Sequence, residues 1–242
     1  MVEPVLMKRA LVIAFLLIPL LAGAAKPMVD GSLKLSSAYL WRGDKVCGFH
    51  FNPDVCFHLG GFTLEHYSFL AMDGKYKEID FDAYYTVGDF DFHIADYYFY
   101  GENLGNADYF TWAKAETSHV DELAIVYHSS AIPLCAKWFT FFWGDWLPDG
   151  EGNRGSLSFS SFLELSTWYE FENIGTLSLN VGTSIIKGMY TSYSRDFMPV
   201  HIGLSYSRSF PIGDFSLPLE AQIVFNPWLR KCYAGASTGI AF

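Results

Sequence analysis

Acidic side chains recur at alternate positions in two neighbouring stretches of the chain. Glu78, Asp80 and Asp82 alternate with apolar residues, and Asp91 and His93 follow in the same alternating pattern. Residues two apart share one face of a β-strand, so a hairpin of these stretches would gather all five side chains on one wall. A wall of carboxylates creates a negative local potential that attracts cations and repels anions. The alternative is that these groups only form a hydrogen-bonded polar filling in a narrow interior.

A second stretch, SSAYLWRG at residues 36–43, combines large aromatic residues with a charge. Tyr39 and Trp41 fall on the same alternating face as the aliphatic residues before them, whereas Arg42 falls on the other face. This pattern predicts an aromatic girdle of Tyr39 and Trp41 at a membrane interface, with Arg42 turned toward a wet interior. Gly43 would then release the strand into a loop.

Nucleophiles and bases are present, but their spacing matches no common catalytic motif. His119 lies near Ser118 and Asp121, His128 precedes two serines, and GxSxG and HExxH are absent. None of the four cysteines (Cys47, Cys56, Cys135 and Cys232) has zinc-site spacing, although a Cys47–Cys56 disulfide could close a short loop. We therefore expect no enzyme, no cofactor and no metal site, with an outer-membrane enzyme of the lipid-modifying or protease-like kind as one alternative.

The elements that must position these residues are β-strands. Alternation of apolar and polar residues returns along the chain from Leu33 to Phe242 and predicts about twelve strands. The predicted connections alternate in length: short turns such as Gly60-Gly61 and Gly88-Asp89 lie between longer segments such as 101–119 and 144–155. An even strand count with short turns on one side and longer loops on the other is typical of an antiparallel transmembrane β-barrel, with short periplasmic turns and longer external loops.

The barrel hypothesis gives the charged residues a place. Glu78, Asp80, Asp82, Asp91, His93 and Arg42 would line the lumen. Further acidic residues fall on inward positions of other strands and outnumber the inward bases: Glu122, Glu164, Glu170 and Glu220 against Lys34 and Arg42. The interior would therefore favour cations weakly.

Composition agrees with a membrane protein that is exported. The 242-residue chain is 51% hydrophobic and 18% aromatic, and only 17% of its residues are charged, against about 25% in soluble proteins. Residues 1–25 carry Lys8 and Arg9 before a short apolar run with a small-residue end, which predicts a cleaved signal peptide. Residues 26–242 would form a single barrel domain. A net charge of −10 argues against nucleic acid as a partner.

The segment SLKLSSAYLWRG, followed downstream by GGFTLEHYSF, resembles the start of the TorF-like porin family of small exported outer-membrane proteins. Ser37, Tyr39, Arg42 and Gly43 match that family's S-x-Y-x-x-R-G element. The resemblance covers about the first 90 residues and implies a small outer-membrane barrel. The sequence departs from the family pattern at Cys47, at Cys56 and in the loop after Gly43.

Together these observations predict an outer-membrane porin or small channel for small hydrophilic solutes. Its other partners would be outer-membrane lipid and the barrel-assembly machinery, which would read the terminal Phe242. One remaining alternative is a plugged barrel that binds a partner or sugar through its aromatic loops 101–119 and 144–155. Another is a secreted soluble lectin-like β protein that stacks sugars on its loop tryptophans, Trp112, Trp143, Trp146 and Trp228. The sequence leaves the solute, the oligomeric state and the openness of the lumen undetermined.

Overall fold

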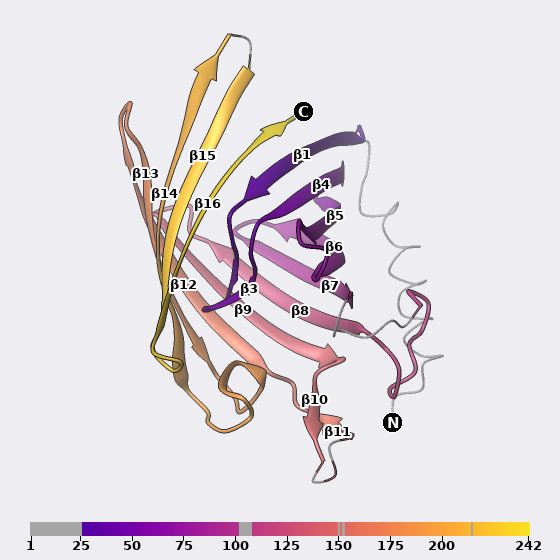
Figure 1. The fold of residues 1–242 in the computed structure, drawn as a ribbon. Coiled ribbons are helices and arrows are strands. Elements are labelled where there is room, and N and C mark those ends of the chain that lie inside the picture. The colour runs from indigo at the N-terminus through magenta and orange to yellow at the C-terminus, as the bar shows by residue number, and fades with distance from the viewer. Residues whose placement is uncertain (1–25, 102–107, 150, 152, 214) are drawn as a thin grey trace.

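Twelve antiparallel strands close into one barrel (Figure 1). The computed structural model describes residues 26–101, 108–149, 151, 153–213 and 215–242, so the predicted signal peptide at 1–25 lies outside the described residues. The barrel strands are β1 (Met28–Ser36), β4 (His50–Leu59), β5 (Phe62–Ala71), β6 (Lys77–Val87), β7 (Phe90–Tyr100), β8 (His119–His128), β9 (Leu134–Trp143), β12 (Ser161–Phe171), β13 (Gly175–Ser184), β14 (Met198–Ile212), β15 (Phe215–Asn226) and β16 (Lys231–Ala241).

Each strand pairs with its neighbour in the chain, and β1 closes the circle by pairing with both β4 and β16. Ser32 of β1 lies opposite Asp54 of β4 on one side and Ala241 of β16 on the other. The backbones of Gly31 and Phe242 exchange two hydrogen bonds of 3.0 Å at the end of this seam. A closed barrel leaves no unpaired sheet edge, and the predicted fold class and strand count are confirmed.

The connections between barrel strands alternate in length, as predicted. The five short turns are 60–61, 88–89, 129–133, 172–174 and 213–214, and each is shorter than the connections before and after it. Three of the longer segments contain small elements: the hairpin of β2 (Tyr39–Trp41) and β3 (Asp44–Cys47), the hairpin of β10 (Trp146–Pro148) and β11 (Arg154–Leu157), and the 3-10 turn η1 (Met189–Thr191). In Figure 1 the C-terminus, the end of β14 and the start of β15 lie toward one end of the barrel, and β10 and β11 lie toward the other. No helix in the described parts of the chain is long and apolar enough to cross a membrane.

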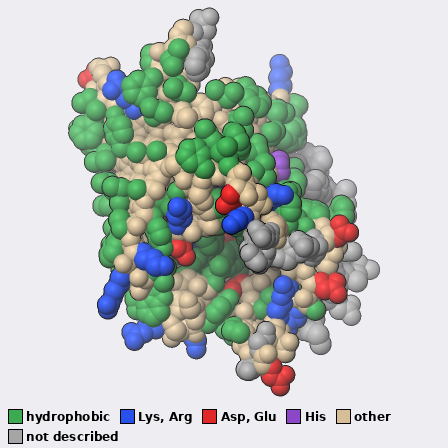
Figure 2. All heavy atoms as spheres, viewed as in Figure 1, with side chains coloured by type: hydrophobic (Ala, Val, Ile, Leu, Met, Phe, Trp, Pro, Cys, Tyr) green, Lys and Arg blue, Asp and Glu red, His purple; other side chains and the backbone are tan. Residues whose placement is uncertain are grey.

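The two faces of the barrel wall differ in chemistry. On β12, Leu165 is 44% exposed and points outward, whereas the neighbouring Phe162 is 0% exposed and points inward. Large apolar side chains are exposed in the same alternating way on several other strands, for example β7, β13 and β14, and Figure 2 shows hydrophobic side chains over much of the outer wall. The outer face therefore offers an apolar surface that water would not favour.

The predicted positions of Tyr39 and Trp41 are wrong. The first barrel strand ends at Ser36, and the β2–β3 hairpin leaves the wall and folds into the interior. The Tyr39 ring stacks on Phe69 of β5 with 3.8 Å between ring centroids, and Trp41 lies 6.2 Å from the buried ring of Phe141. Both residues therefore pack inside the barrel. The prediction failed because it extended the alternation of the first strand beyond Ser37, where the chain leaves the wall.

Candidate functional site

The β2–β3 hairpin crosses the interior and is held at its tip by an ion pair with the far wall. Arg42 donates a hydrogen bond from Nη2 to Oε1 of Glu122 on β8 at 2.7 Å, and a second bond joins Nη1 to Oε2. Arg42 Nη1 also bonds the Tyr190 hydroxyl at 2.5 Å, and the Tyr97 hydroxyl donates to Glu122 at 2.9 Å. The two charged side chains are only 7% and 2% exposed, so the pair is removed from water.

Aromatic rings surround the Arg42 guanidinium. Its central carbon lies 3.9 Å from the centroid of the Phe139 ring. Four more rings lie within 4.7 to 5.9 Å: Trp41, Phe141, Phe162 and Tyr190. Burial alone would lower the pKa of Arg42, but the Glu122 carboxylate and the Tyr190 hydroxyl together raise that pKa well above its ordinary value. Arg42 therefore keeps its charge inside the barrel, where guanidinium–ring contacts stabilise it.

The turn of the hairpin explains why glycine follows this arginine. Arg42 and Gly43 both have positive φ angles, 44° and 95°. A Cβ atom on Gly43 would lie 1.9 Å from the backbone oxygen of Val200 on β14. Asn226 of β15 donates a hydrogen bond of 3.0 Å to the Gly43 carbonyl. The hairpin is thus anchored to β8 on one side of the barrel and to β14 and β15 on the other.

The predicted acidic residues face the interior, but they do not share one environment. Glu78 accepts a 2.5 Å hydrogen bond from Tyr76, and Asp80 is 0% exposed. Glu78 and Asp80 do not line the cavity that Asp82, Asp91 and His93 share. Asp82 pairs with His93 at 2.7 Å, and Asp91 accepts a hydrogen bond from Thr86 at 2.7 Å.

A cavity of about 340 Å³ opens beside this second group. Asp82, Asp91, His93 and Glu122 line it, together with residues that the alternation pattern does not single out: Glu65, Tyr67, Tyr84, Ala95, Tyr97, Ala124, Val126, His128, Lys137 and Phe139. The strand that carries Glu65 has a weak alternation, which is why its inward face was not assigned. Carboxylates outnumber lysines and arginines on this cavity wall, and Lys137 pairs with Glu164 at 2.9 Å.

A larger cavity, of about 630 Å³, lies near the short-turn end of the barrel. Its wall carries both signs of charge, from Lys34 and Arg208 on one hand and Glu170 and Glu220 on the other. The acidic character of the interior is therefore concentrated on the β4 to β8 side.

The side chains considered for catalysis are engaged in other contacts. His119 is buried, its Nδ1 lies 2.7 Å from Asp96, and its Nε2 contacts the Tyr109 carbonyl. With both ring nitrogens occupied, His119 has none free to activate Ser118. His128 contacts Asp91 at 3.1 Å, and Ser130 donates to Asp89.

Three of the four loop tryptophans pack against other rings of the protein. Trp112 stacks on His119 with 3.9 Å between ring centroids, and Trp143 and Trp146 meet edge to face at 5.0 Å. All four cysteines are free thiols, so the Cys47–Cys56 disulfide that the sequence allows is not formed. Cys47 lies on the inward hairpin, whereas Cys56 lies on the barrel wall.

The fold defines a class: a closed antiparallel β-barrel of twelve strands, apolar outside and charged inside, with a hairpin folded into its interior. No protein-family model matches the chain, and no curated protein matches it. The resemblance to the TorF-like porin family therefore stays an expectation.

Among solved structures the chain is similar to one described as KdgM porin, with a TM-score of 0.43 and 11% identity over 90% of this chain and 98% of that one. It is also similar to a porin refined at 1.8 Å resolution, with a TM-score of 0.38 and 12% identity over 90% and 99% of the two chains. A mutant of Rh. blastica porin gives a TM-score of 0.32 and 8% identity over 90% and 100%. At such identities a likeness concerns the fold alone.

Proposed function

We propose that the protein is a small outer-membrane channel that passes small hydrophilic solutes with a weak preference for cations. The observation that carries this proposal is the pairing of an apolar outer wall with a charged, cavity-containing interior in a closed barrel. Closed barrels satisfy all backbone hydrogen bonds internally, which lets strands cross hydrocarbon. Strands of about ten residues are long enough to cross a bilayer when tilted.

The cation preference rests on the 340 Å³ cavity. Glu65, Asp82 and Asp91 contribute carboxylates to its wall. Lys137 on the same wall is already paired with Glu164, and the imidazoles of His93 and His128 contact Asp82 and Asp91. Carboxylates that face a confined aqueous space raise the local concentration of cations. The β2–β3 hairpin narrows the interior beside this cavity and limits passage to small solutes. Both ring nitrogens of His119 already have hydrogen-bond partners, so this histidine is not free to act as a catalytic base, which favours a channel over an enzyme.

A second candidate function is a plugged barrel that does not conduct while the hairpin is seated. The Arg42–Glu122 pair and its aromatic surroundings favour this candidate, because they fill the interior with nearly water-free contacts. Such a barrel would act through its external loops.

Single-channel recording separates the two candidates. Residues 26–242 are refolded in detergent and inserted into a planar bilayer, and the reversal potential is measured under a salt gradient. Discrete steps with a cation-directed reversal potential support the channel. Steps that appear only after Arg42→Met, and not in the control variant Arg208→Met, support the plugged barrel. A folded barrel that gives no steps in any of the three proteins overturns the channel proposal.

A further inference from the structure

Five potential metal ligands meet on the inner wall near the short-turn end of the barrel. Asp30 comes from β1, Asp54, Cys56 and His58 come from alternate positions of β4, and Glu65 comes from β5. Cys56 lies directly opposite Asp30 in the β1–β4 pairing and directly opposite Glu65 in the β4–β5 pairing. The register of the strands therefore places Asp30, Cys56 and Glu65 side by side across β1, β4 and β5. The Cβ atoms of residues directly opposite each other on paired strands lie about 5 Å apart.

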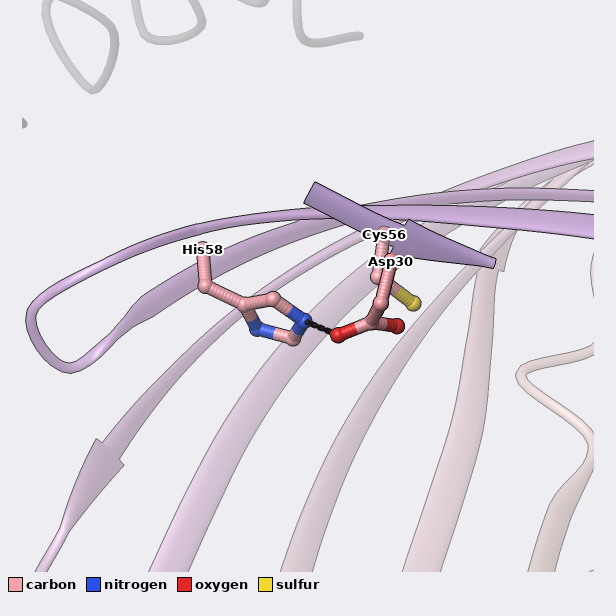
Figure 3. Close-up of side chains that lie close together, drawn as sticks. All are labelled: Asp30, Cys56 and His58. Atoms are coloured by element: carbon pink, nitrogen blue, oxygen red, sulfur yellow. Dashed lines mark hydrogen bonds and ion pairs between the residues drawn. The ribbon is translucent and has the colours of Figure 1, made fainter. Parts of the chain in front are cut away.

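The donor atoms are close enough to share one ion. One ligand atom from each of Asp30, Cys56 and His58 lies within 4.8 Å of the others, and the same holds for Asp54, Cys56 and Glu65. Figure 3 shows the His58 ring and the Asp30 carboxylate pointing toward each other, with the Cys56 side chain beside Asp30. His58 Nε2 lies 2.9 Å from Asp30 Oδ2, and Cys56 Sγ lies 3.6 Å from Asp54 Oδ1.

The His58 ring is already held in an orientation that suits coordination. Its second nitrogen, Nδ1, lies 2.9 Å from the Thr63 hydroxyl on β5. A metal-binding histidine usually has its other ring nitrogen hydrogen-bonded, which fixes the tautomer and the direction of the ligating nitrogen. This contact is independent of the acidic residues and directs Nε2 into the cluster.

The cluster also carries uncompensated negative charge. Among the described residues, no recorded ion pair joins Asp30, Asp54 or Glu65 to a lysine or arginine, and the one partner recorded for Asp30 is His58. The Asp30 and His58 side chains are 49% and 27% exposed, so an ion can reach them from water. Carboxylates without a basic partner favour a bound cation.

We propose that Asp30, Cys56 and His58 bind a divalent transition-metal ion of the Zn²⁺ type, with Asp54 and Glu65 adding negative charge beside it. A thiolate and an imidazole select this class over Mg²⁺ and Ca²⁺, which prefer oxygen ligands. The ion replaces the His58–Asp30 hydrogen bond and takes both atoms as ligands. The Cys56 thiol gives up its proton to solvent on binding, and water completes a four-coordinate shell.

The test uses Cd²⁺ as a spectroscopic probe and the folded protein in detergent. Cadmium bound to a thiolate gives a charge-transfer absorption band, so titration reports both stoichiometry and the use of a cysteine. We expect one Cd²⁺ per chain, displaced by Zn²⁺, and loss of the band in Cys56→Ser. Cys135→Ser is the matched control because Cys135 is a free cysteine on β9, and it should keep the band. Thr63→Val should weaken binding by about tenfold, the effect of losing an outer hydrogen bond to a ligand.

A second measurement needs no variant. Zn²⁺ should protect Cys56 from alkylation in the wild-type protein, as read by peptide mass spectrometry, and leave the alkylation of Cys232 unchanged. The proposal is overturned if wild-type protein gives no thiolate band, if the band survives in Cys56→Ser, or if Zn²⁺ does not protect Cys56. Both assays report binding in detergent, so their outcome is independent of whether the barrel conducts.

Discussion

Removing the charge of Arg42 should release the β2–β3 hairpin from the barrel wall. The perturbation is Arg42→Met. Methionine places an apolar side chain of similar length among the aromatic rings, but it leaves the Glu122 carboxylate without its charged partner. Glu122 is 2% exposed, and its remaining recorded hydrogen bond comes from Tyr97. An unpaired carboxylate in this position should therefore destabilise the seated hairpin.

The expected size follows from the burial of the pair. Breaking a buried ion pair by removing one partner costs about 3 to 5 kcal/mol, because the other charge stays desolvated. At about 1.4 kcal/mol for each factor of ten, the population with a released hairpin should rise by about a hundredfold to a few thousandfold. The double variant Arg42→Met/Glu122→Met removes both charges and should recover most of this loss, since apolar replacement of a buried pair is often neutral.

Limited trypsin digestion measures that population. Lys45 lies on β3 and is present in every variant, so the rate of cleavage after Lys45 compares them directly. When opening and closing are fast relative to cleavage, this rate follows the open population. Arg208→Met is the matched control, because Arg208 contacts Phe210 on the wall and should leave the cleavage rate unchanged.

The reasoning would be refuted by a rise of less than about tenfold in Arg42→Met, well below the range expected for a broken buried pair. It would also fail if the double variant were cleaved as fast as the single one, because the cost would then come from lost packing and not from the unpaired Glu122.

Three further variants test other parts of the structure. Gly43→Ala should increase cleavage after Lys45, because the added Cβ would lie 1.9 Å from the Val200 oxygen, and Gly48→Ala, where the new atom meets open space, is its control. Replacing Asp80, Asp82 and Asp91 together with Asn should lower the cation-over-anion permeability ratio in bilayer recordings, and an unchanged ratio would remove this wall as the filter. Leu165→Arg should reduce unfolding free energy in lipid vesicles by about 2 to 4 kcal/mol, the cost of a charge facing the bilayer midplane, whereas Leu165→Val should cost far less.

Much of the barrel could be predicted because its signal is local. A strand presents every second residue to the same face, so the inward positions of Asp82, Asp91 and His93 follow from alternation. The alternation of short turns and longer connections could also be predicted from the sequence, and the structure confirms it. Where alternation is weak, as around Glu65, the inward face could not be assigned from the sequence.

The sequence by itself determined the strands, their number and the chemistry of the two faces of the wall. Only the tertiary structure decided that residues 37–49 fold into the interior, because that choice depends on partners far along the chain. Arg42 and Glu122 are 80 residues apart, and Gly43 meets Asn226 across 183 residues. The cluster of Asp30, Cys56 and His58 likewise arises from the register of β1 against β4, which no spacing along a single strand contains. Alternation is a property of one strand, whereas strand pairing and side-chain packing are properties of the closed barrel. The candidate sites depend on this pairing and packing.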